Sequence, residues 1–363
     1  MRIALIAHAT APWTNDYVRC FEQAGHEVLL ISFGPDPHEG PNRIHVGSGK
    51  KTDEMSKHLY VTRAPRVRRA LRGFGPDVVF APYLISNGLA AALAWNGPLL
   101  VSAFGADVLE QAGRRPAPPW LHQRLVRFIC RRSPTVHAVS DELADALVEM
   151  GIDRKRIACF PIGVDLPAFE AAASSSNVSP ADIICIRRQE PVYENHVLVE
   201  ALARLRDQGR KFRCTLVGGG VLMEERQAQV RRLGLDEFVT FTGQIPNEQV
   251  RAHLVAAQVY VSASSSDGTS ASLLEAMAAG LFPVVTRISA NLPWIREGET
   301  GLFFGVGNAG ELAAALAIAL DDPQLRSRAT QENRRLVEEK GSQQANMARM
   351  LEIMSRAIAN GRH

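Results

Sequence analysis

Short, largely apolar segments alternate along the chain with longer segments whose apolar residues recur every three or four positions. Residues 3–7 and 99–102 are of the first kind, and they predict strands buried on both faces. Residues 15–24 and 141–150 are of the second kind and predict helices, the latter capped by Ser140. Strands and helices in alternation favour a parallel sheet with helices on both faces.

The alternation is interrupted at residues 161–180 and then starts again. Residues 170–180 are rich in Ala, Ser and Pro, a composition typical of linkers. We therefore predict a first domain over residues 1–166, a linker over 167–180, a second domain over 181–344 and a terminal helix over 345–363. In the second domain the pattern predicts strands at residues 182–187, 213–217, 238–242, 259–262, 282–286 and 301–304. Both domains are expected to be doubly wound α/β units, with a site in the cleft between them.

Composition narrows the class of protein. The 363 residues are 46% hydrophobic and 22% charged, which is typical of globular proteins, and the net charge of +3 is too small for a dedicated nucleic-acid binder. The five cysteines are scattered without a Cys-x-x-Cys pair, which argues against a zinc site or a disulfide framework and indicates a reducing, cytoplasmic setting. No stretch approaches the ~18 apolar residues of a membrane span, and residues 3–7 are too short for a signal peptide.

Arginines gather in two stretches of the first half, from Arg63 to Arg72 and from Arg114 to Arg132. Such stretches are commonly solvated helix faces. Alternatively, they attract anionic lipid head groups, at about 1 kcal/mol per residue, which would make the protein peripheral on the inner face of a membrane. A phosphorylated acceptor is a third explanation.

The most informative stretch is residues 264–285, where a polar, glycine-containing loop leads into a predicted helix over 272–279. The first N–H groups of a helix lack intrahelical acceptors and the helix dipole is positive there, so this end suits an anion such as a diphosphate. Asp267 in the loop and Glu275 in the first helical turn can accept hydrogen bonds from sugar or ribose hydroxyls. Alternatively, residues 266–268 form only a turn and an N-cap, and Glu275 is a solvated helix residue.

This stretch resembles the signature of retaining, nucleotide-sugar-dependent glycosyltransferases of family 4, which have the GT-B fold. The signature is an acid, seven residues and then Glu-Ala-Met-Ala-x-Gly, and here it runs from Asp267 to Gly280, with Asp in place of the usual Glu. Further segments agree with the family in the same order, namely residues 11–28, 104–107, 137–140, 162–165, 187–193, 216–220 and 241–243.

The resemblance implies two Rossmann-like domains facing across a cleft, the second binding the donor and the first the acceptor, with the terminal helix returning to the first. It implies transfer of a sugar from a nucleotide diphosphate-sugar, UDP- or GDP-linked, to a hydroxyl acceptor with retention. The acceptor would be a sugar, a lipid-linked or another hydroxyl compound in the synthesis of cell-envelope glycans, glycolipids or polysaccharides. We expect no cofactor and no metal, because the chain has no Asp-x-Asp motif and a cationic side chain with a helix N-terminus can stabilise the departing diphosphate.

The resemblance also implies roles for individual residues. Glu275 is expected to bind the ribose, and Asp267 to contact the transferred sugar. Arg188 is expected to neutralise the departing diphosphate, with Arg187 as the alternative. Tyr193 stands where the family has a lysine, and tyrosine supplies no positive charge.

Neighbouring loops are expected to complete the donor site. The backbone of Gln244 and Ile245 is expected to edge the base, and Leu273 and Leu274 to donate N–H groups to phosphate. The remaining expected donor contacts are Thr269, Gly218 and Gly219. Tight packing of a turn explains these glycines equally well.

In the first domain, His8 follows the first predicted strand, at the strand end where sites form, and is either catalytic or structural. Phe104 to Asp107 resembles the family's His-Gly-x-Asp segment, so Asp107 is expected to be catalytic. Phe104 takes the place of the histidine and can neither transfer a proton nor form a hydrogen bond through its side chain. Trp13 either lines the acceptor pocket or packs against its loop.

Phe104 and Tyr193 leave open two alternatives to an active transferase. One is a non-catalytic partner subunit that binds a nucleotide-sugar. The other is a GT-B sugar-nucleotide epimerase, which would need acid and base groups aimed at the donor sugar. The spacing of Asp267 and Glu275 argues against the epimerase.

Overall fold

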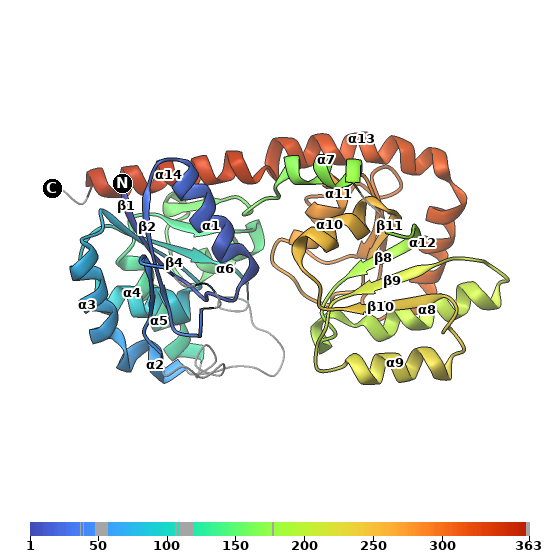
Figure 1. Cartoon of the computed structure of the whole chain (residues 1–363), viewed down its shortest axis with the longest axis horizontal. Coiled ribbons are helices and arrows are strands. Elements are labelled where there is room, and N and C mark those ends of the chain that lie inside the picture. The colour runs from blue at the N-terminus through green and yellow to red at the C-terminus, as the bar shows by residue number, and fades with distance from the viewer. Residues whose placement is uncertain are drawn as a thin grey trace. The chain divides into compact units, whose positions relative to one another are not determined.

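The computed structural model describes residues 1–36, 38, 40–47, 57–105, 108, 119–175 and 178–360. The chain divides into two compact units, the first made of Met1–Pro161 with Gln344–His363 and the second of Ile162–Gln343. Each unit is a parallel sheet covered by helices (Figure 1). The doubly wound α/β fold predicted from the alternation is therefore confirmed.

Unit 1 is built on a seven-stranded sheet with the order β3-β2-β1-β4-β5-β6-β7. Its strands are β1 (Arg2–Ile6), β2 (Glu27–Ser32), β3 (Arg43–His45), β4 (Val78–Pro82), β5 (Leu99–Ala103), β6 (Val136–Ala138) and β7 (Ile157–Cys159). Its helices are α1 (Pro12–Gln23), α2 (Lys57–Thr62), α3 (Ala64–Phe74), α4 (Leu89–Ala94), α5 (Pro119–Arg131), α6 (Asp141–Glu149) and α14 (Gln343–Asn360), with the short turns η2 (Leu84–Gly88) and η3 (Arg154–Arg156).

The centre of this sheet is β1, which pairs in parallel with both β2 and β4. Ile3 to Ile6 are fully buried, as expected for a strand covered on both faces. Strand order reverses between β1 and β4, and open α/β sheets bind ligands at the carboxyl ends of strands at such a reversal. The cap predicted for α6 is present, because the Ser140 hydroxyl accepts from Leu143 N.

Unit 2 is built on a six-stranded sheet with the order β10-β9-β8-β11-β12-β13. Its strands are β8 (Ala181–Ile186), β9 (Cys214–Val217), β10 (Val239–Gly243), β11 (Ala257–Ser262), β12 (Phe282–Thr286) and β13 (Leu302–Phe304). Its helices are α7 (Leu166–Ser175), α8 (Asn195–Asp207), α9 (Met223–Arg232), α10 (Asn247–Val255), α11 (Ala271–Ala278), α12 (Ala309–Asp321) and α13 (Pro323–Lys340), with the short turn η4 (Pro191–Tyr193).

The sheet of unit 2 separates two apolar layers. Ile183 and Cys185 of β8 face a layer shared with α8, α9 and α12, whereas Ile184 faces a layer shared with α7, α10 and α11. Figure 1 shows α8 and α9 on one side of the strands and α7, α10 and α11 on the other. All six predicted strands are present within two residues of their predicted ends, because β-strand side chains alternate and both faces here are apolar.

The prediction of a linker over residues 167–180 is wrong for its first part, which is helical. Leu166–Ser175 forms the helix α7, whose Phe169 is buried in the core of unit 2. Alanines are the best helix formers, and they outweigh the small polar residues that suggested a linker. The units divide at Pro161, a few residues before the predicted boundary.

Candidate functional site

The strand order of unit 2 reverses between β8 and β11, and the polar stretch singled out from the sequence follows these two strands. Arg187 comes directly after β8. The serine-rich loop 263–270 leaves β11 and enters α11. The topology alone therefore brings these segments to one edge of the sheet.

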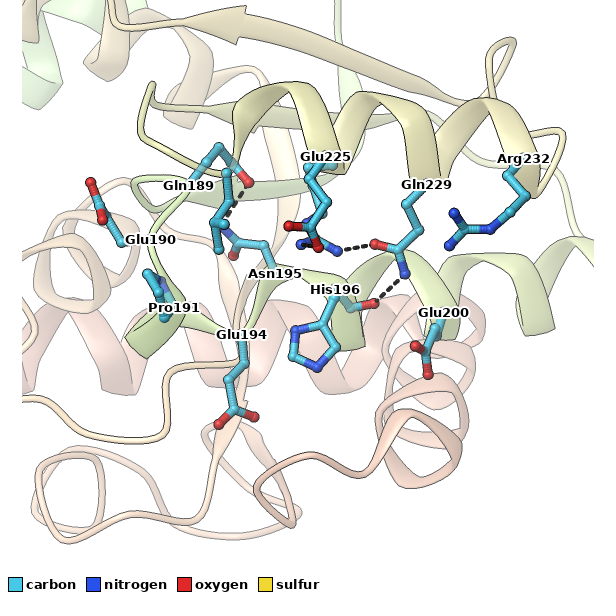
Figure 2. Close-up of a pocket in the computed structure, with 12 residues that line it drawn as sticks. Gln189, Glu190, Pro191, Glu194, Asn195, His196, Glu200, Glu225, Gln229 and Arg232 are labelled. Carbon is cyan, nitrogen blue, oxygen red and sulfur yellow. Dashed lines mark hydrogen bonds and ion pairs between the residues drawn. The ribbon is translucent and has the colours of Figure 1, made fainter. Parts of the chain in front are cut away.

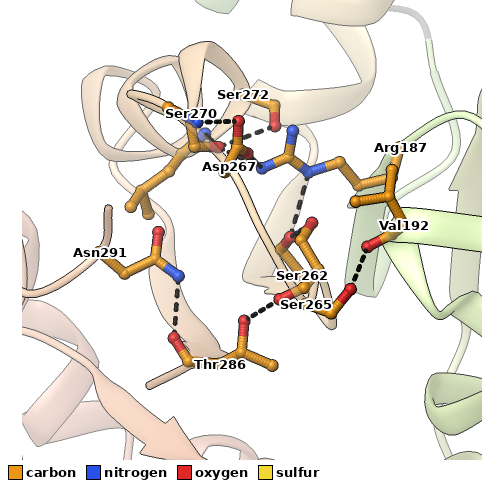
Figure 3. A network of polar contacts seen from close by, with 12 residues as sticks. Arg187, Val192, Ser262, Ser265, Asp267, Ser270, Ser272, Thr286 and Asn291 are labelled. Atoms are coloured by element: carbon orange, nitrogen blue, oxygen red, sulfur yellow. Dashed lines mark hydrogen bonds and ion pairs between the residues drawn. The ribbon is translucent and has the colours of Figure 1, made fainter. Parts of the chain in front are cut away.

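Arg187 is the centre of a polar network at this edge (Figure 3). Its Nη2 donates to Asp267 Oδ2 at 2.6 Å and to the Ser270 hydroxyl, and its Nε donates to Ser262 Oγ at 3.1 Å. The Arg187 side chain is only 10% exposed and that of Asp267 19%. The guanidinium also lies 5.2 Å from the centre of the Tyr193 ring, within the range of a cation–π contact.

Burial disfavours the charge on Arg187, but Tyr260, Asp267 and Tyr193 outweigh that effect and hold its pKa above the ordinary arginine value. Burial likewise raises the pKa of the Tyr260 hydroxyl, while Arg187 and a hydrogen bond with Ser272 oppose the rise. Arg187 therefore stays protonated beside Asp267 in a partly dehydrated setting, where a charge acts on a ligand more strongly than it would in water.

The helix α11 begins beside this charge. Ser270 is its N-cap, and the Ser270 hydroxyl accepts from Leu273 N at 3.2 Å. Asp267 Oδ1 accepts from Gly268 N at 2.9 Å, which fixes the loop that leads into the helix. The cap leaves the N–H groups of Ala271 and Ser272 as first-turn donors without an intrahelical acceptor.

The loop before α11 is tied to its neighbours on both sides. Ser265 donates from its N to Val192 O at 2.9 Å, next to Tyr193. On the other side, Thr286 Oγ1 donates to Ser264 O at 2.6 Å, and Asn291 Nδ2 donates to Thr286 O at 2.9 Å (Figure 3). These bonds tie the loop to η4 on one side and to β12 on the other, so the position of Asp267 is preorganised.

The structure distinguishes the two arginines that the sequence left as alternatives. Arg188, the first choice, is 70% exposed and pairs with Glu190 at 3.1 Å. Arg187, the second choice, is the one that meets Asp267 and the start of α11. The geometry thus favours Arg187 over Arg188 as the cation of this site.

Other predicted donor residues lie on or beside α11. Glu275 is half-buried and is the fifth residue of the helix, so it lies in the second turn and not in the first. Thr269 is half-buried in the loop. Leu273 N and Leu274 N already donate to Ser270. We therefore expect the N–H groups at the very start of α11 to take the role toward a phosphate that was predicted for these two leucines.

The glycine turn after β9 packs directly on the Arg187 segment. A Cβ on Gly218 would lie 2.6 Å from Arg187 O, and Gly218 has a φ of +126° that favours glycine. Gly218 N donates to Gly243 O at 2.9 Å, and a Cβ on Gly219 would lie 3.7 Å from Gln244 N. The packing explanation is therefore supported for Gly218, whereas a Cβ on Gly219 would make only ordinary van der Waals contact. The exposed Gln244 and the adjoining half-buried Ile245 lie next to the same glycine turn.

A polar cavity of about 420 Å³ lies between α8 and α9 (Figure 2). Gln189 and Asn195 form part of its wall, with Asn195 Nδ2 donating to Gln189 Oε1 at 3.0 Å. Arg226 is buried there, paired with Glu225 at 3.1 Å and bonded to Gln229. Arg187 and Asp267 do not line it, so this cavity is separate from the predicted donor site.

In unit 1 the predicted residues lie at the carboxyl edge of the sheet. His8 follows β1, is half-buried, and lies edge-on to Tyr83 at 6.0 Å between ring centres. Phe104 follows β5, and its ring lies 5.1 Å from that of Trp13. Asp107 lies outside the described residues. Tyr83 was not anticipated, since no sequence pattern distinguishes it.

The structural interpretation of His137 is supported. It is fully buried in β6, its Nδ1 lies 2.5 Å from Ser102 Oγ and its Nε2 lies 2.8 Å from Phe160 O. Burial lowers its pKa to about 4, so the ring is neutral at neutral pH. A neutral ring that donates from Nε2 to Phe160 and accepts from Ser102 satisfies both nitrogens.

Two family matches together cover most of the chain. Residues 13–167 match Glycosyltransferase Family 4, and residues 169–336 match Glycosyl transferases group 1. The chain belongs to the group 1 glycosyl transferases. The family membership that the Asp267–Gly280 signature indicated is thereby confirmed, and the chain is a member of a glycosyltransferase family.

Within this family the chain is 30% identical over 251 residues to the putative colanic acid biosynthesis glycosyltransferase WcaL of Escherichia coli (strain K12), a match that covers 67% of this chain. The match spans 59% of that relative's length. The chain is also 28% identical over 370 residues to the D-inositol 3-phosphate glycosyltransferase of Pseudarthrobacter chlorophenolicus, covering 90% of this chain and 88% of that relative.

Solved glycosyltransferase structures share the fold over the whole chain. Sucrose-phosphate synthase from Thermosynechococcus elongatus has a TM-score of 0.81 at 20% identity, with 99% of this chain and all of that chain covered. Anabaena HepE, solved in complex with UDP, has a TM-score of 0.75 at 16% identity, with 98% and 100% covered. These likenesses establish the GT-B fold that the resemblance implied.

No helix in the described part of the chain is both long and apolar enough to cross a membrane. Among the same residues, no three or more His, Cys, Asp or Glu side chains are grouped so that they could hold a metal ion.

Proposed function

We propose that this glycosyltransferase moves a sugar from a nucleotide diphosphate-sugar to a hydroxyl acceptor, with retention at the anomeric carbon and without a metal ion. The observation that carries the proposal is the buried Arg187–Asp267 pair at the capped start of α11. Anabaena HepE has been solved with UDP and with UDP-glucose, which supports a UDP-sugar as donor, with a GDP-sugar as the alternative.

The site residues account for the charge that develops in this reaction. The bond between the anomeric carbon and the diphosphate oxygen breaks, and its electron pair leaves with the diphosphate. Arg187 and the first N–H groups of α11 stabilise that negative charge. A bond forms between the acceptor oxygen and the same face of the anomeric carbon, and the acceptor proton passes to the departing diphosphate.

Each carboxylate has a separate task in this proposal. Asp267 accepts hydrogen bonds from the transferred sugar and, by pairing with Arg187, holds the guanidinium in place. Glu275 accepts from the ribose hydroxyls. Arg187 uses Nε and Nη2 for its bonds to Ser262, Asp267 and Ser270, and we assign its Nη1 to the diphosphate.

Thermal-shift titration with UDP-, GDP-, ADP- and CMP-sugars tests the donor site, using Arg187→Met and Arg188→Met as a matched pair. Loss of a charged hydrogen bond is worth about 1.5–3 kcal/mol, so Arg187→Met should weaken donor binding roughly tenfold to a hundredfold. Arg188→Met should change it less than about twofold. Arg187→Lys keeps a positive charge beside Asp267, so it serves as the control for a folding defect caused by Arg187→Met.

The opposite ranking would move the site to Arg188 and contradict the geometry. Absence of binding to every donor would remove the donor-site assignment built on Arg187, Asp267 and Glu275. Binding without turnover when acceptors are supplied would favour the alternative of a non-catalytic nucleotide-sugar-binding subunit, which Phe104 and Tyr193 suggest. Interconversion of the donor sugar would favour the epimerase.

We also propose an anionic membrane surface as a partner of unit 1, where a lipid-linked acceptor would be met. On α5 the exposed Trp120 and Phe128 lie at helical spacing with the exposed Arg124 and Arg131, a combination typical of interfacial helices. The arginines of α3 are also exposed, around a buried face formed by Val67, Leu71 and Phe74. Co-sedimentation with phosphatidylglycerol vesicles that is weaker for Trp120→Ala is expected, and equal binding to phosphatidylcholine would contradict it.

A further inference from the structure

Three segments that follow neighbouring strands of the unit 1 sheet each bring one aromatic ring to the same place, and Trp13 lies in the first turn of α1. Trp13 follows β1, Tyr83 follows β4 and Phe104 follows β5, and these three strands are neighbours in the sheet. The ring centres lie 5.1 Å apart for Trp13 and Phe104, 4.9 Å for Tyr83 and Phe104 and 5.7 Å for Trp13 and Tyr83. We call these three residues the aromatic triad.

The triad differs from the aromatic core beside it. Tyr17, Phe21 and Phe80 also contact one another, but each is 0% exposed. All three members of the triad keep part of their surface in contact with solvent. Core packing therefore does not explain why three large rings are gathered at the strand ends.

The backbone that holds Tyr83 is strained. Tyr83 has a φ of +67° and a ψ of 108°, a backbone conformation that residues other than glycine rarely adopt. The π-turn η2 follows directly, and such turns are concentrated at functional sites. Asn87 Nδ2 donates to Pro82 O at 2.9 Å and Tyr83 N donates to Ser102 O at 2.9 Å, so the strained turn is held in place.

The triad also lies where this fold binds ligands. Strand order reverses between β1 and β4, and Trp13 and Tyr83 follow these two strands. Strain, exposure and topology thus indicate one site by three separate observations.

The chemistry of the rings selects the ligand. Aromatic faces carry negative potential and attract C–H hydrogens of partial positive charge, such as those on one face of a pyranose ring. The indole N–H of Trp13 and the hydroxyl of Tyr83 add polar tips that suit the hydroxyl rim of a sugar.

The three side chains of the triad carry no charge, which favours a neutral ligand over a phosphate. His8 lies edge-on to Tyr83, at 6.0 Å between ring centres.

We infer that Trp13, Tyr83 and Phe104 form a stacking site for a neutral pyranose, which is the acceptor sugar of the transfer. This inference rests on the proposed function, because that function supplies the need for a hydroxyl-bearing acceptor. Phe104 then has a binding role that a histidine would fill less well, since stacking on the apolar face of a sugar favours a ring without a charge.

Saturation-transfer NMR in the absence of donor tests the inference, with the methyl α-pyranosides of glucose, galactose and mannose as probes. At least one should bind, with the strongest saturation on the C–H hydrogens of one ring face. An aromatic contact contributes about 1 kcal/mol, so Phe104→Leu should weaken binding about fivefold. Trp13→Ala should weaken it at least as much, and Trp13→Phe should restore most of it.

Phe74→Leu is the matched control, because Phe74 contacts Arg2 at the amino ends of the strands and lies outside the site. It should leave sugar binding within about twofold. The inference is overturned if no pyranoside binds, if Phe104→Leu and Phe74→Leu behave alike, or if glucose 6-phosphate or cyclohexylmethanol binds more tightly than every pyranoside. A donor-induced thermal shift in the same sample separates the two failures: with that shift intact, only the acceptor site is wrong.

Discussion

Arg187 illustrates how a single residue can prepare a site for chemistry. Its guanidinium is buried beside Asp267, and removing one partner of such a pair typically costs about 3–5 kcal/mol because the other charge remains buried. Tyr193 lies against the same guanidinium, so its ring contributes to the positive site although it carries no charge. The cation is in place before any donor arrives, and the reaction does not have to reorient it.

His137 gives a prediction for stability at the scale of one residue. Its folded pKa of about 4 lies below the unfolded value of about 6.5, so the unfolded state binds the proton first as the pH falls. The stability contributed by neutral His137 is complete above about pH 6.5 and is lost as the pH falls toward about 4. Urea denaturation should therefore show a loss on the order of 3 kcal/mol across this range.

His137→Asn isolates this effect. The variant should be less stable than the parent at pH 7, because the bonds with Ser102 and Phe160 O are weakened. Its stability should fall less between pH 7 and pH 4 than that of the parent. An equal fall in both proteins would show that other groups cause the acid sensitivity.

The choice between Arg187 and Arg188 shows what a single sequence leaves open at this scale. Both the signature and the local charge were visible, but consecutive side chains at a strand end point in opposite directions. Which of the two points inward depends on where β8 stops relative to the loop before α11. That is a tertiary fact, settled by the contacts of Arg187 with Ser262 and Ser270.

At the scale of elements, the start of α11 contributes both to the stability of unit 2 and to the proposed donor site. Ser270 caps the helix and also accepts from Arg187. Ser270→Ala should lower the free energy of unfolding by about 1 kcal/mol through the lost cap. It should also weaken donor binding in the same thermal-shift titration, because Arg187 loses a partner.

Asn308→Ala provides the control for this prediction. Asn308 caps α12 by accepting from Glu311 N at 3.0 Å, in the same unit but away from Arg187. It should cost similar stability while leaving donor binding unchanged. Equal effects of the two variants on donor binding would mean that Ser270 acts only on the stability of unit 2.

Elements with strong patterns were predictable, and elements defined by tertiary context were not. The strands of unit 2 were predictable because most contain a run of consecutive apolar residues, such as Ile183–Ile186 in β8 and Val259–Val261 in β11. By contrast, α7 was taken for a linker, since its apolar face is short and its burial depends on packing against α10. The π-helical turn η2 was not predicted, and neither was the positive φ of Tyr83 directly before it, because Tyr is not a residue that favours this conformation.

At the scale of the whole molecule, the chain repeats one topological device. Each unit is a parallel sheet whose strand order reverses once near its centre, at β1 and β4 in unit 1 and at β8 and β11 in unit 2. The Arg187–Asp267 pair lies at the second reversal and the aromatic triad at the first. We therefore assign the charged diphosphate to unit 2 and the neutral acceptor to unit 1.

The most direct test of the account is the anomer first released when the protein hydrolyses its donor in EDTA, followed by proton NMR with the best-bound α-linked nucleotide-sugar. Water then takes the place of the acceptor. We predict that the α-sugar appears before mutarotation produces the β-form, and that the rate is the same with and without EDTA. Initial release of the β-sugar, or loss of hydrolysis in EDTA, would contradict a retaining, metal-independent transfer stabilised by Arg187 and the start of α11.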